Sequence, residues 1–375
     1  MASAGVFYFS GTGNTARAAE LIAAELRAAG HTVSLYRVEH GSGGKLLAVS
    51  CEPSALHVFC FPIYACGVPN IMLNYLRRLP RARPSFDIRA SDFGLPRAQR
   101  AAVVCTMGDD ISYDKKGERH HLSGFEGHAL TQAAGTLRQR GYDVFLTGAC
   151  SYPLNWTQVV NAPRPEIDAE LRALGDSQAT EIGKRIAAGE RSIRRFGKAH
   201  ALWTVPFSLL YSVFGRVAMG KLYVADSDCN ACGLCVRGCP ARAIRLRGTA
   251  PARGLSPKPK PRWGWNCEGC QRCINTCPRN AIQTSWARLT AEAVHALVPI
   301  PFLIWRLGPH PYMPVRPILL EVFFWLGVYV VFTWLLDEFV WLLGLVPGVR
   351  RVVEGSFTKR FRRYLEPHFR PPASG

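Results

Sequence analysis

The first half of the chain alternates short apolar runs with longer stretches of helical character. The apolar runs predict five strands, at Gly5–Phe9, Thr32–Val38, Leu56–Ile63, Arg100–Thr106 and Val144–Thr147. The longer stretches predict helices at about Ala16–Ala29, Pro69–Leu79, Phe125–Gly141 and Pro165–Gly189. Continuous apolar strands are typical of a parallel sheet that is covered on both faces. The pattern therefore predicts an α/β, doubly wound sheet of five parallel strands over residues 1–190.

Beyond residue 190 the pattern changes three times. Residues 191–222 are first basic and then apolar, which predicts a linker. Residues 223–285 carry most of the cysteines and predict a small separate domain. Residues 286–375 form an apolar and basic C-terminal segment, for which we expect mainly helical structure.

Three apolar stretches flank the cysteine-rich part, at Leu202–Phe214, Val294–Leu307 and Val322–Leu336. The last is a run of 15 residues interrupted only by Thr333 and followed by Asp337 and Glu338. A membrane-spanning helix needs about 20 apolar residues, so this run is marginal for a span. Membrane association and a soluble cap that folds over the cysteine-rich domain both remain open.

Basic residues lie on both sides of this apolar run. Arg306 and Arg316 precede it, and the following residues come after it: Arg350, Arg351, Lys359, Arg360, Arg362 and Arg363. A single crossing would carry one basic group to the outer side, against the positive-inside tendency. A helical hairpin, or helices lying in the interface, would keep both groups on the cytosolic side.

The charge of the chain is strongly positive and uneven. The 375 residues carry a formal charge of +19, and residues 190–264 hold 14 Lys and Arg against 3 Asp and Glu. Such a patch suits a partner with an acidic surface, or an anionic membrane surface. No nucleic-acid-binding motif accompanies the charge, so we expect no nucleic-acid partner.

The N-terminus and the cysteines bear on the compartment. Met1–Gly5 leads directly into an apolar strand, with no charged region or cleavage site of a secretory signal. Eight of the 13 cysteines cluster between Cys229 and Cys277 rather than being spread as a disulfide framework. We therefore expect a cytoplasmic protein, free or bound to the inner face of the cytoplasmic membrane.

The loop after the first strand, Ser10-Gly11-Thr12-Gly13-Asn14-Thr15, has the composition of a phosphate site. A phosphate at a helix N-terminus accepts from unpaired backbone N–H groups, and the glycines allow close approach. Four polar side chains in six residues favour a phosphate monoester. Two alternatives stay open. The spacing Gly11-x-Gly13-x-x-Ala16, with Glu39 after the second strand, also fits a dinucleotide fingerprint, and the loop could be a structural glycine turn.

This loop resembles the FMN-phosphate loop of flavodoxins. Flavodoxins flank the flavin with two further loops. The loop after the third strand, Pro62-Ile63-Tyr64-Ala65-Cys66-Gly67, resembles one of them. The other is expected after the fourth strand, where this chain has Thr106-Met107-Gly108-Asp109. The resemblance covers about residues 1–190 and implies FMN as cofactor, bound by these sixteen residues. By position, Tyr64 is the candidate flavin-stacking aromatic, with a solvated strand-end tyrosine as the alternative. A second aromatic is not placed, although Tyr113 lies nearby. Cys66 is expected to be a small buried residue rather than a redox thiol.

The cysteine-rich part contains the same spacing twice. The first run is Cys229-x2-Cys232-x2-Cys235-x3-Cys239-Pro. The second run is Cys267-x2-Cys270-x2-Cys273-x3-Cys277-Pro. Paired Cys-x2-Cys also binds zinc, but a repeated triple with a trailing Cys-Pro is not a zinc pattern. Thiolates are the natural ligands of iron–sulfur centres.

This block resembles a bacterial-type ferredoxin module with two [4Fe–4S] clusters, in which the fourth cysteine of each run serves the other cluster. The resemblance implies that cluster one takes Cys229, Cys232, Cys235 and Cys277. It implies that cluster two takes Cys239, Cys267, Cys270 and Cys273. Residues Gly248–Trp265, rich in Pro, Lys and Arg, depart from the pattern and predict an exposed insertion.

Together the two parts resemble fused flavodoxin–ferredoxin ("ferrodoxin") proteins over about 285 residues. That family resemblance implies an electron-transfer protein that passes electrons between FMN, the two clusters and a redox partner. No catalytic residues stand out in the sequence. One alternative is an FMN-dependent oxidoreductase acting on a quinone or another small acceptor at the membrane. A second is a redox-sensing interaction protein.

Overall fold

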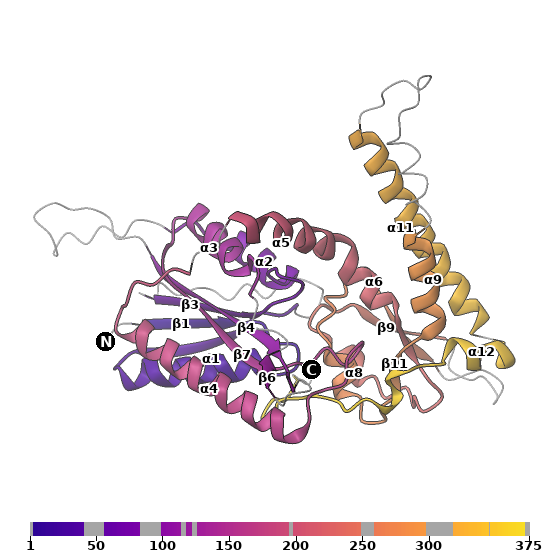
Figure 1. Ribbon diagram of the computed structural model, residues 1–375, viewed down its shortest axis with the longest axis horizontal. Coiled ribbons are helices and arrows are strands. Elements are labelled where there is room, and N and C mark those ends of the chain that lie inside the picture. The colour runs from indigo at the N-terminus through magenta and orange to yellow at the C-terminus, as the bar shows by residue number, and fades with distance from the viewer. Residues whose placement is uncertain are drawn as a thin grey trace, which may run out of the picture.

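The computed structural model describes residues 3–40, 56–82, 99–113, 118–121, 126–194, 198–248, 259–297, 318–344 and 346–371. Within these ranges a domain built on a five-stranded sheet lies beside a smaller cysteine-rich module (Figure 1). Helices near the C-terminus project from the far side of that module.

The sheet consists of β1 (Ser3–Tyr8), β2 (Thr32–Arg37), β3 (Leu56–Pro62), β4 (Arg100–Asp109) and β7 (Asp143–Pro153). All neighbouring pairs are parallel, in the order β2-β1-β3-β4-β7. This is the strand order of the flavodoxin-like doubly wound fold, so the fold predicted from the apolar pattern is confirmed. β1 and β3 are buried over almost their whole length, which explains their continuous apolar sequences.

Helices cover both faces of the sheet and create two separate cores. α1 (Asn14–Ala28) and α4 (Pro165–Ala187) pack together on one face, while α2 (Asn70–Arg78) and α3 (Ala129–Gln139) pack together on the other (Figure 1). The start of α4 follows from its sequence, because Pro165 occupies the first turn together with acidic residues.

Two strands are longer than the apolar pattern predicts. β4 continues three residues past Thr106, and β7 continues past Thr147 to Pro153. The two strands pair with each other along this extension, up to Asp109 opposite Pro153. The backbone hydrogen bonds between β4 and β7 therefore extend both strands beyond their apolar runs.

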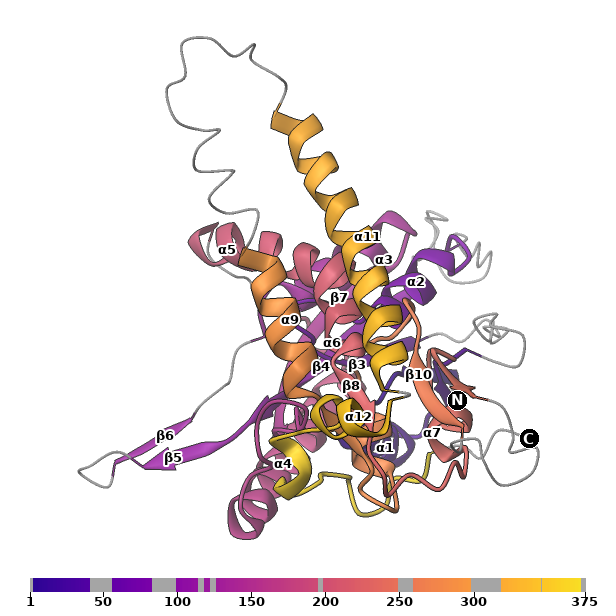
Figure 2. The same cartoon turned by 90° about the vertical axis from the view of Figure 1, so that its right-hand side faces the viewer.

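A short hairpin projects from the sheet domain. It is formed by β5 (Ile111–Tyr113) and β6 (Arg119–His121), which pair antiparallel and stand away from the body in Figure 2. Neither strand has an apolar run, so the apolar pattern did not predict this hairpin.

The cysteine-rich module is a small α+β unit of two hairpin-like sheets. β8 (Tyr223–Ala225) pairs with β11 (Ile282–Thr284), and β9 (Ile244–Arg247) pairs with β10 (Lys260–Trp263), both antiparallel. Two short helices, α7 (Leu234–Arg237) and α8 (Arg272–Thr276), each follow a cysteine loop and pack against each other. This arrangement agrees with the two repeated cysteine runs.

The segment that joins the two parts is helical. It consists of three elements without a break between them: α5 (Lys198–Leu210), a π-helical turn η1 (Tyr211–Gly215) and α6 (Arg216–Lys221). Among the helical stretches whose side chains the structure describes throughout, one, Ala199–Lys221, is long and apolar enough to cross a membrane by length and composition.

The C-terminal helices form a hairpin beside the module. The chain leaves the module through α9 (Trp286–Leu297) and returns through α11 (Ile318–Leu343), which packs against α9, and then enters α12 (Pro347–Val353). In Figure 2, α9 and α11 lie side by side and α11 extends well beyond the body. The mainly helical C-terminal segment predicted from the sequence is therefore present in the described residues.

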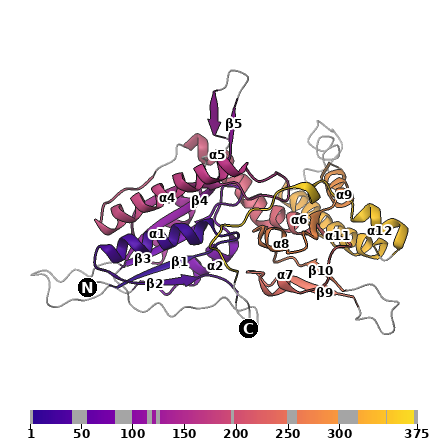
Figure 3. The same cartoon turned by 90° about the horizontal axis from the view of Figure 1, so that it is seen from below.

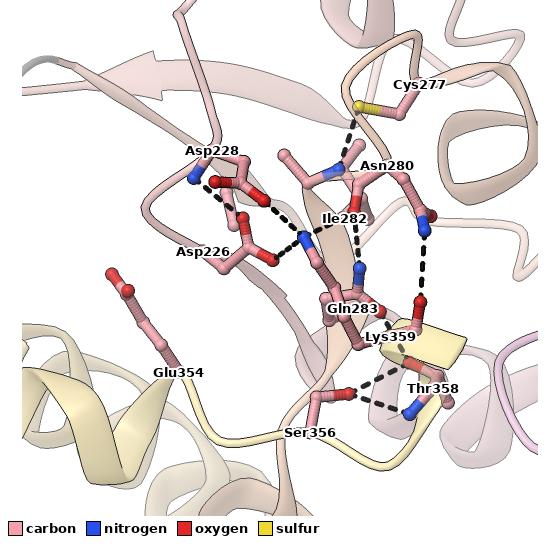
Figure 4. Close-up of polar contacts among 12 residues, drawn as sticks. Asp226, Asp228, Cys277, Asn280, Ile282, Gln283, Glu354, Ser356, Thr358 and Lys359 are labelled. Atoms are coloured by element: carbon pink, nitrogen blue, oxygen red, sulfur yellow. Dashed lines mark hydrogen bonds and ion pairs between the residues drawn. The ribbon is translucent and has the colours of Figure 1, made fainter. Parts of the chain in front are cut away.

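After α12 the chain returns to the sheet domain. Figure 3 shows this C-terminal tail running from α12 across the module. Figure 4 shows its first anchor near η2 (Thr358–Arg360), where Lys359 Nζ contacts Asp226 Oδ2 at 2.6 Å and Asp228 Oδ2 at 2.7 Å. Farther along, the backbone N–H of Glu366 donates to the carbonyl of Thr12 at 2.9 Å. The tail thus connects the module to the loop after β1.

A buried arginine binds the module to the sheet domain through several hydrogen bonds. Arg272, 1% exposed, donates to the carbonyl oxygens of Ser10 and Gly11 at 2.5 and 2.9 Å and to that of Gly238 at 2.9 Å. Its guanidinium also binds both carboxylate oxygens of Glu39, at 2.6 and 3.1 Å. Burial lowers the pKa of Arg272, but Glu39 outweighs this effect and the net pKa is raised.

Replacing Glu39 with alanine should destabilise the protein strongly. The change leaves the Arg272 guanidinium buried without its carboxylate, and breaking a buried ion pair in this way costs about 3–5 kcal/mol. Chemical denaturation of the full chain measures the loss. Glu190→Ala, which removes one side of the exposed pair with Arg185, is the matched control and should change the unfolding free energy little. Equal effects of the two substitutions would contradict the central role of Arg272.

The buried histidine of β3 should make stability depend on pH. His57 is 2% exposed, packs against the ring of Phe7 and has no hydrogen-bond partner for either ring nitrogen among the described residues. Burial lowers its pKa to about 4. Between pH 6.5 and 4 the unfolded chain binds a proton that the folded chain does not, so stability falls as pH falls through this window, by up to about 3 kcal/mol.

His57→Phe removes the titrating group and keeps an aromatic ring among its aromatic neighbours. The unfolding free energy of the wild type should therefore fall more than that of the variant as pH is lowered from 7 to 4. The variant thus becomes more stable relative to the wild type. Urea denaturation at a series of pH values measures this. If the difference in unfolding free energy between variant and wild type stayed constant over the pH series, His57 would not be the group that makes stability depend on pH.

Candidate cofactor sites

A cavity of about 580 Å³ opens at the carboxyl ends of the central strands. This volume lies within the range of small-molecule sites, about 300–1,000 Å³. Thirteen of the sixteen residues predicted to bind FMN line it: Ser10, Gly11, Thr12, Asn14, Thr15, Pro62, Ile63, Tyr64, Ala65, Cys66, Thr106, Met107 and Gly108. The structure thus brings the three predicted loops together around one space.

The other three predicted residues lie behind the cavity wall. Gly13 is the N-cap of α1, with a φ of 113° that favours glycine. Gly67 packs so closely against Ser208 of α5 that a Cβ would overlap its hydroxyl. The carboxylate of Asp109 accepts the backbone N–H of Asp110 at 2.8 Å. These residues shape the loops rather than face the cavity.

The loop after β1 has the features of a phosphate cradle. No side chain caps α1 at Gly13, so the N–H groups of its first turn are open to an anion. Ser10, Thr12 and Thr15 are all at most 1% exposed, and the hydroxyls of Thr15 and Thr106 lie 2.6 Å apart. Several hydroxyl donors therefore converge with the helix N-terminus at one end of the cavity.

Asn14 has a different part in this loop. Its amide nitrogen donates to the carbonyl of Pro153 at 3.1 Å, and its amide oxygen accepts the hydroxyl of Tyr364. On the outer side of the loop, a Cβ on Gly13 would overlap Glu366 and Phe369. The C-terminal tail therefore packs directly against the back of the loop, which the sequence did not indicate.

The loop after β3 turns sharply at two left-handed residues. Ala65 and Cys66 have φ values of 46° and 68°, and the turn is closed by paired backbone hydrogen bonds between Tyr64 and Gly67. Tyr64 lines the cavity and its ring meets that of Phe9 edge-on. Burial raises the pKa of the Cys66 thiol, which agrees with a small buried residue rather than a reactive thiolate.

Other aromatic side chains of the cavity come from outside the predicted loops. Trp156 follows β7, while Phe207 and Tyr211 come from α5 and the π-helical turn. Trp156 sits at the carboxyl end of a parallel strand, a position where ligands commonly bind, so the fold rule could have found it. The apolar composition of residues 202–214 gave no sign that Phe207 and Tyr211 face a cavity. The side chain of Tyr113 lies outside the described residues.

The acidic residue of the dinucleotide alternative is already engaged. Glu39, which could have bound a ribose, holds Arg272 through both carboxylate oxygens. The geometry therefore favours the phosphate-monoester interpretation of the loop after β1.

The first predicted set of cluster ligands is brought together at the outer side of the module. Burial raises the pKa of Cys235 to about 12. The thiols that add to this shift are those of Cys229, Cys277 and Cys232. Cys232 is exposed.

The second predicted set is brought together at the inner side. Burial raises the pKa of Cys273 well above its usual range, and the neighbouring thiols that add to it are those of Cys267, Cys270 and Cys239. The indole N–H of Trp263 lies 3.4 Å from the sulfur of Cys273. Hydrogen bonds to cluster sulfurs are among the groups that tune cluster potentials.

The fourth cysteine of each run has the same local geometry. The backbone N–H of Ala243 lies 3.3 Å from the sulfur of Cys239, and that of Ala281 lies 3.3 Å from the sulfur of Cys277 (Figure 4). The two halves of the module are therefore built alike, as the repeated spacing implies. Among the described residues there is no group of three or more His, Cys, Asp or Glu that could hold a single metal ion.

The second set lies against the cavity. Gly269 and Gln271, which flank Cys270, form part of the cavity wall. The carbonyl oxygen of Cys270 is so close to Gly11 that a Cβ there would overlap it. The loop of one predicted cluster and the predicted phosphate loop are therefore in direct contact.

Comparison with known proteins separates the two parts. Residues 228–281 match the family of the 4Fe–4S dicluster domain. A flavodoxin from the domain Archaea is 17% identical, with a TM-score of 0.27, over 48% of this chain and 98% of its own. Flavodoxin 2 from Bacillus cereus is 18% identical, with a TM-score of 0.28, over 50% of this chain and 98% of its own. No curated protein matches the chain.

At these TM-scores the strand order, not the similarity, identifies the fold of the first part. The parallel order β2-β1-β3-β4-β7 is the flavodoxin order. With the matched segment at residues 228–281, it identifies this chain as a fusion of a flavodoxin-like domain and a 4Fe–4S dicluster domain, with a redox role.

Proposed function

We propose that this chain is an electron-transfer protein that passes electrons between FMN and two [4Fe–4S] clusters, and between these and a separate redox partner. The observation that carries the proposal is the wall shared by the cavity and the second cysteine set. Gly269 and Gln271 line the cavity, and the backbone of Cys270 contacts the phosphate loop. The two kinds of cofactor would then be neighbours inside one body.

The cavity fits FMN at both ends. The uncapped start of α1 and the buried hydroxyls of Ser10, Thr12 and Thr15 would hold the phosphate. The aromatic side chains of Tyr64, Trp156 and Tyr211 would surround the ring system. When bound, FMN exchanges electrons singly or in pairs and each cluster exchanges one at a time.

The positions of the two cysteine sets give the order in which the cofactors would lie along the protein. Cluster two, held by Cys239, Cys267, Cys270 and Cys273, would lie between the cavity and cluster one. Cys267 is 7% exposed, whereas Cys232 of the other set is exposed. Electrons would therefore enter or leave the protein at cluster one.

The surface around cluster one suits an acidic partner. Arg237 and Arg279 are exposed there, and Arg237 donates to the carbonyl of Cys232 at 3.2 Å. Leu234 is 46% exposed beside them. An apolar centre with basic residues around it would orient a partner that carries carboxylates around its own redox centre.

A second candidate is direct reduction of an apolar small acceptor such as a quinone. Phe207 both lines the cavity and is 50% exposed on the outer side of α5, where other apolar residues are also exposed. An acceptor could thus approach the cavity from this side. Turnover of a soluble quinone by the purified protein without a partner protein would support this candidate over a pure carrier.

Replacing Cys270 with alanine should remove one cluster. Each [4Fe–4S] cluster needs four thiolates, so iron and labile sulfide should fall from about eight to about four per chain, while bound FMN remains. Electrons given to the flavin should then no longer reach cluster one, as followed by EPR after rapid mixing with a reductant.

The matched control is Cys150→Ala, which makes the same change at a fully buried cysteine of β7 outside both sets. It should keep the wild-type iron content. If Cys270→Ala also kept it, or if both variants lost iron equally, the proposed ligand set would be wrong.

Replacing Thr12 with valine should weaken binding of FMN but not of riboflavin. The substitution keeps the shape of the side chain and removes a hydroxyl that would face the phosphate, and a hydrogen bond to a charged group corresponds to about 10–100-fold in affinity. Fluorescence titration of the apoprotein with both flavins measures the ratio. Thr136→Val on α3, outside the cavity, is the control. Equal loss for both flavins would contradict a phosphate contact.

A further inference from the structure

The middle of α11 is apolar and exposed over more than half of its circumference. Val330, Val331, Phe332, Trp334 and Leu335 are 40–56% exposed. Because successive residues of a helix point about 100° apart, these positions span an arc of about 200°. Every exposed side chain of α11 that the structure describes is apolar. A helix that caps a soluble protein would have a polar outer face.

Only a narrow stripe of α11 faces the protein. Thr333, Asp337 and Val340 are at most 7% exposed, and their spacing places them on one side of the helix. Asp337 binds three cations of the body: Lys221 Nζ at 2.8 Å, Arg288 at 2.6 Å and Arg262. Glu338 binds Arg247 at 2.7 Å. The two acidic residues that interrupt the apolar sequence therefore mark the point where α11 joins the body.

The length of α11 beyond this point matches a bilayer. Residues 318–336 number 19, which at 1.5 Å per residue rise about 28 Å, against about 30 Å for a hydrocarbon core. Their sequence contains one charged residue, Glu321 in the first turn. Figures 1 and 2 show α11 extending away from the body at this end.

A second apolar surface lies on the same side of the molecule. Figures 1 and 2 both place α5 on the side toward which α11 projects. Leu202, Trp203, Leu209 and Leu210 of α5 are 50–79% exposed. Tryptophan and leucine on the outer face of such a helix are typical of the membrane interface.

We infer that α11, supported by α9, inserts into a lipid bilayer with anionic headgroups, and that α5 rests at its surface. The cofactor-bearing body then stays on the cytosolic side. A second copy of the chain would cover an apolar stripe of roughly 100°, whereas lipid covers the whole exposed arc of about 200°. The chain after α11 returns to the body, so the basic residues from Arg350 to Arg363 stay on the cytosolic side, as the positive-inside tendency favours. The excess of basic residues in residues 190–264 attracts anionic lipid.

Flotation of the full chain with vesicles tests this inference, which does not depend on the proposed electron transfer. Vesicles of phosphatidylglycerol and phosphatidylethanolamine should carry the wild-type protein upward in a density gradient. Phosphatidylcholine vesicles should carry a smaller fraction. The double variant Val331→Asp/Leu335→Asp should lower the partition coefficient at least ~10-fold, because carboxylates are costly in hydrocarbon.

The control is Val159→Asp/Val160→Asp, which adds the same two charges at exposed apolar positions outside α5, α9 and α11. It should float like the wild type. Gel filtration and circular dichroism in mild detergent check that each variant is folded, and the single variant Val331→Asp replaces the pair if the pair is not.

Three results would overturn the inference. The wild type could stay at the bottom of the gradient with both kinds of vesicle. The α11 variant could float as well as the control. The chain could form a dimer in detergent-free buffer that the α11 substitutions separate, with no flotation, which would assign the apolar face to a second copy instead. Equal flotation with both lipid mixtures would refute the part played by anionic headgroups.

Discussion

The buried guanidinium of Arg272 is the interaction on which the relation between the two halves of the chain depends. It lies between two cysteines of one predicted ligand set, yet four of its hydrogen bonds go to the sheet domain, at Ser10, Gly11 and Glu39. A charge this deeply buried is tolerated only when its partners are all in place. Separating the halves would leave Arg272 and Glu39 without each other, so the interface behaves as part of the fold.

This constraint changes how a fusion of two redox domains is understood. A flexible tether raises the effective concentration of one centre near another, but leaves their distance variable. Here the loop around Cys270 forms part of the wall of the flavin-sized cavity. The linker is itself a helix, and Phe207 and Tyr211 on it close the same cavity. The distance between the cavity and the second cysteine set is thus fixed by packing rather than left variable by a tether.

Local signals were sufficient for much of the fold, and the loops that they singled out lie together around one cavity. The apolar runs located all five strands of the sheet, and the glycine and hydroxyl residues of one loop predicted the phosphate cradle. The resemblance to a ferredoxin module implied which thiols would be neighbours, and the structure places them so. The strands and the loop depend on residues close together in the sequence, whereas the exchange of the fourth cysteines joins residues far apart.

The features that sequence reasoning missed depend on distant parts of the chain. The extra lengths of β4 and β7 come from their mutual pairing. Glu39 had the position of a ribose ligand, and only its contact with Arg272, more than 200 residues away, gives it another partner. Trp156 and Tyr211 reach the cavity from elements that carry no motif.

The C-terminal tail has a consequence for the order in which the cradle is completed. Tyr364 bonds to Asn14 across a separation of 350 residues, and Glu366 and Phe369 pack on the back of the same loop. The ribosome therefore makes the loop after β1 350 residues before it makes the outer wall of that loop. Until the tail has been made and has packed there, the cradle is open on one side.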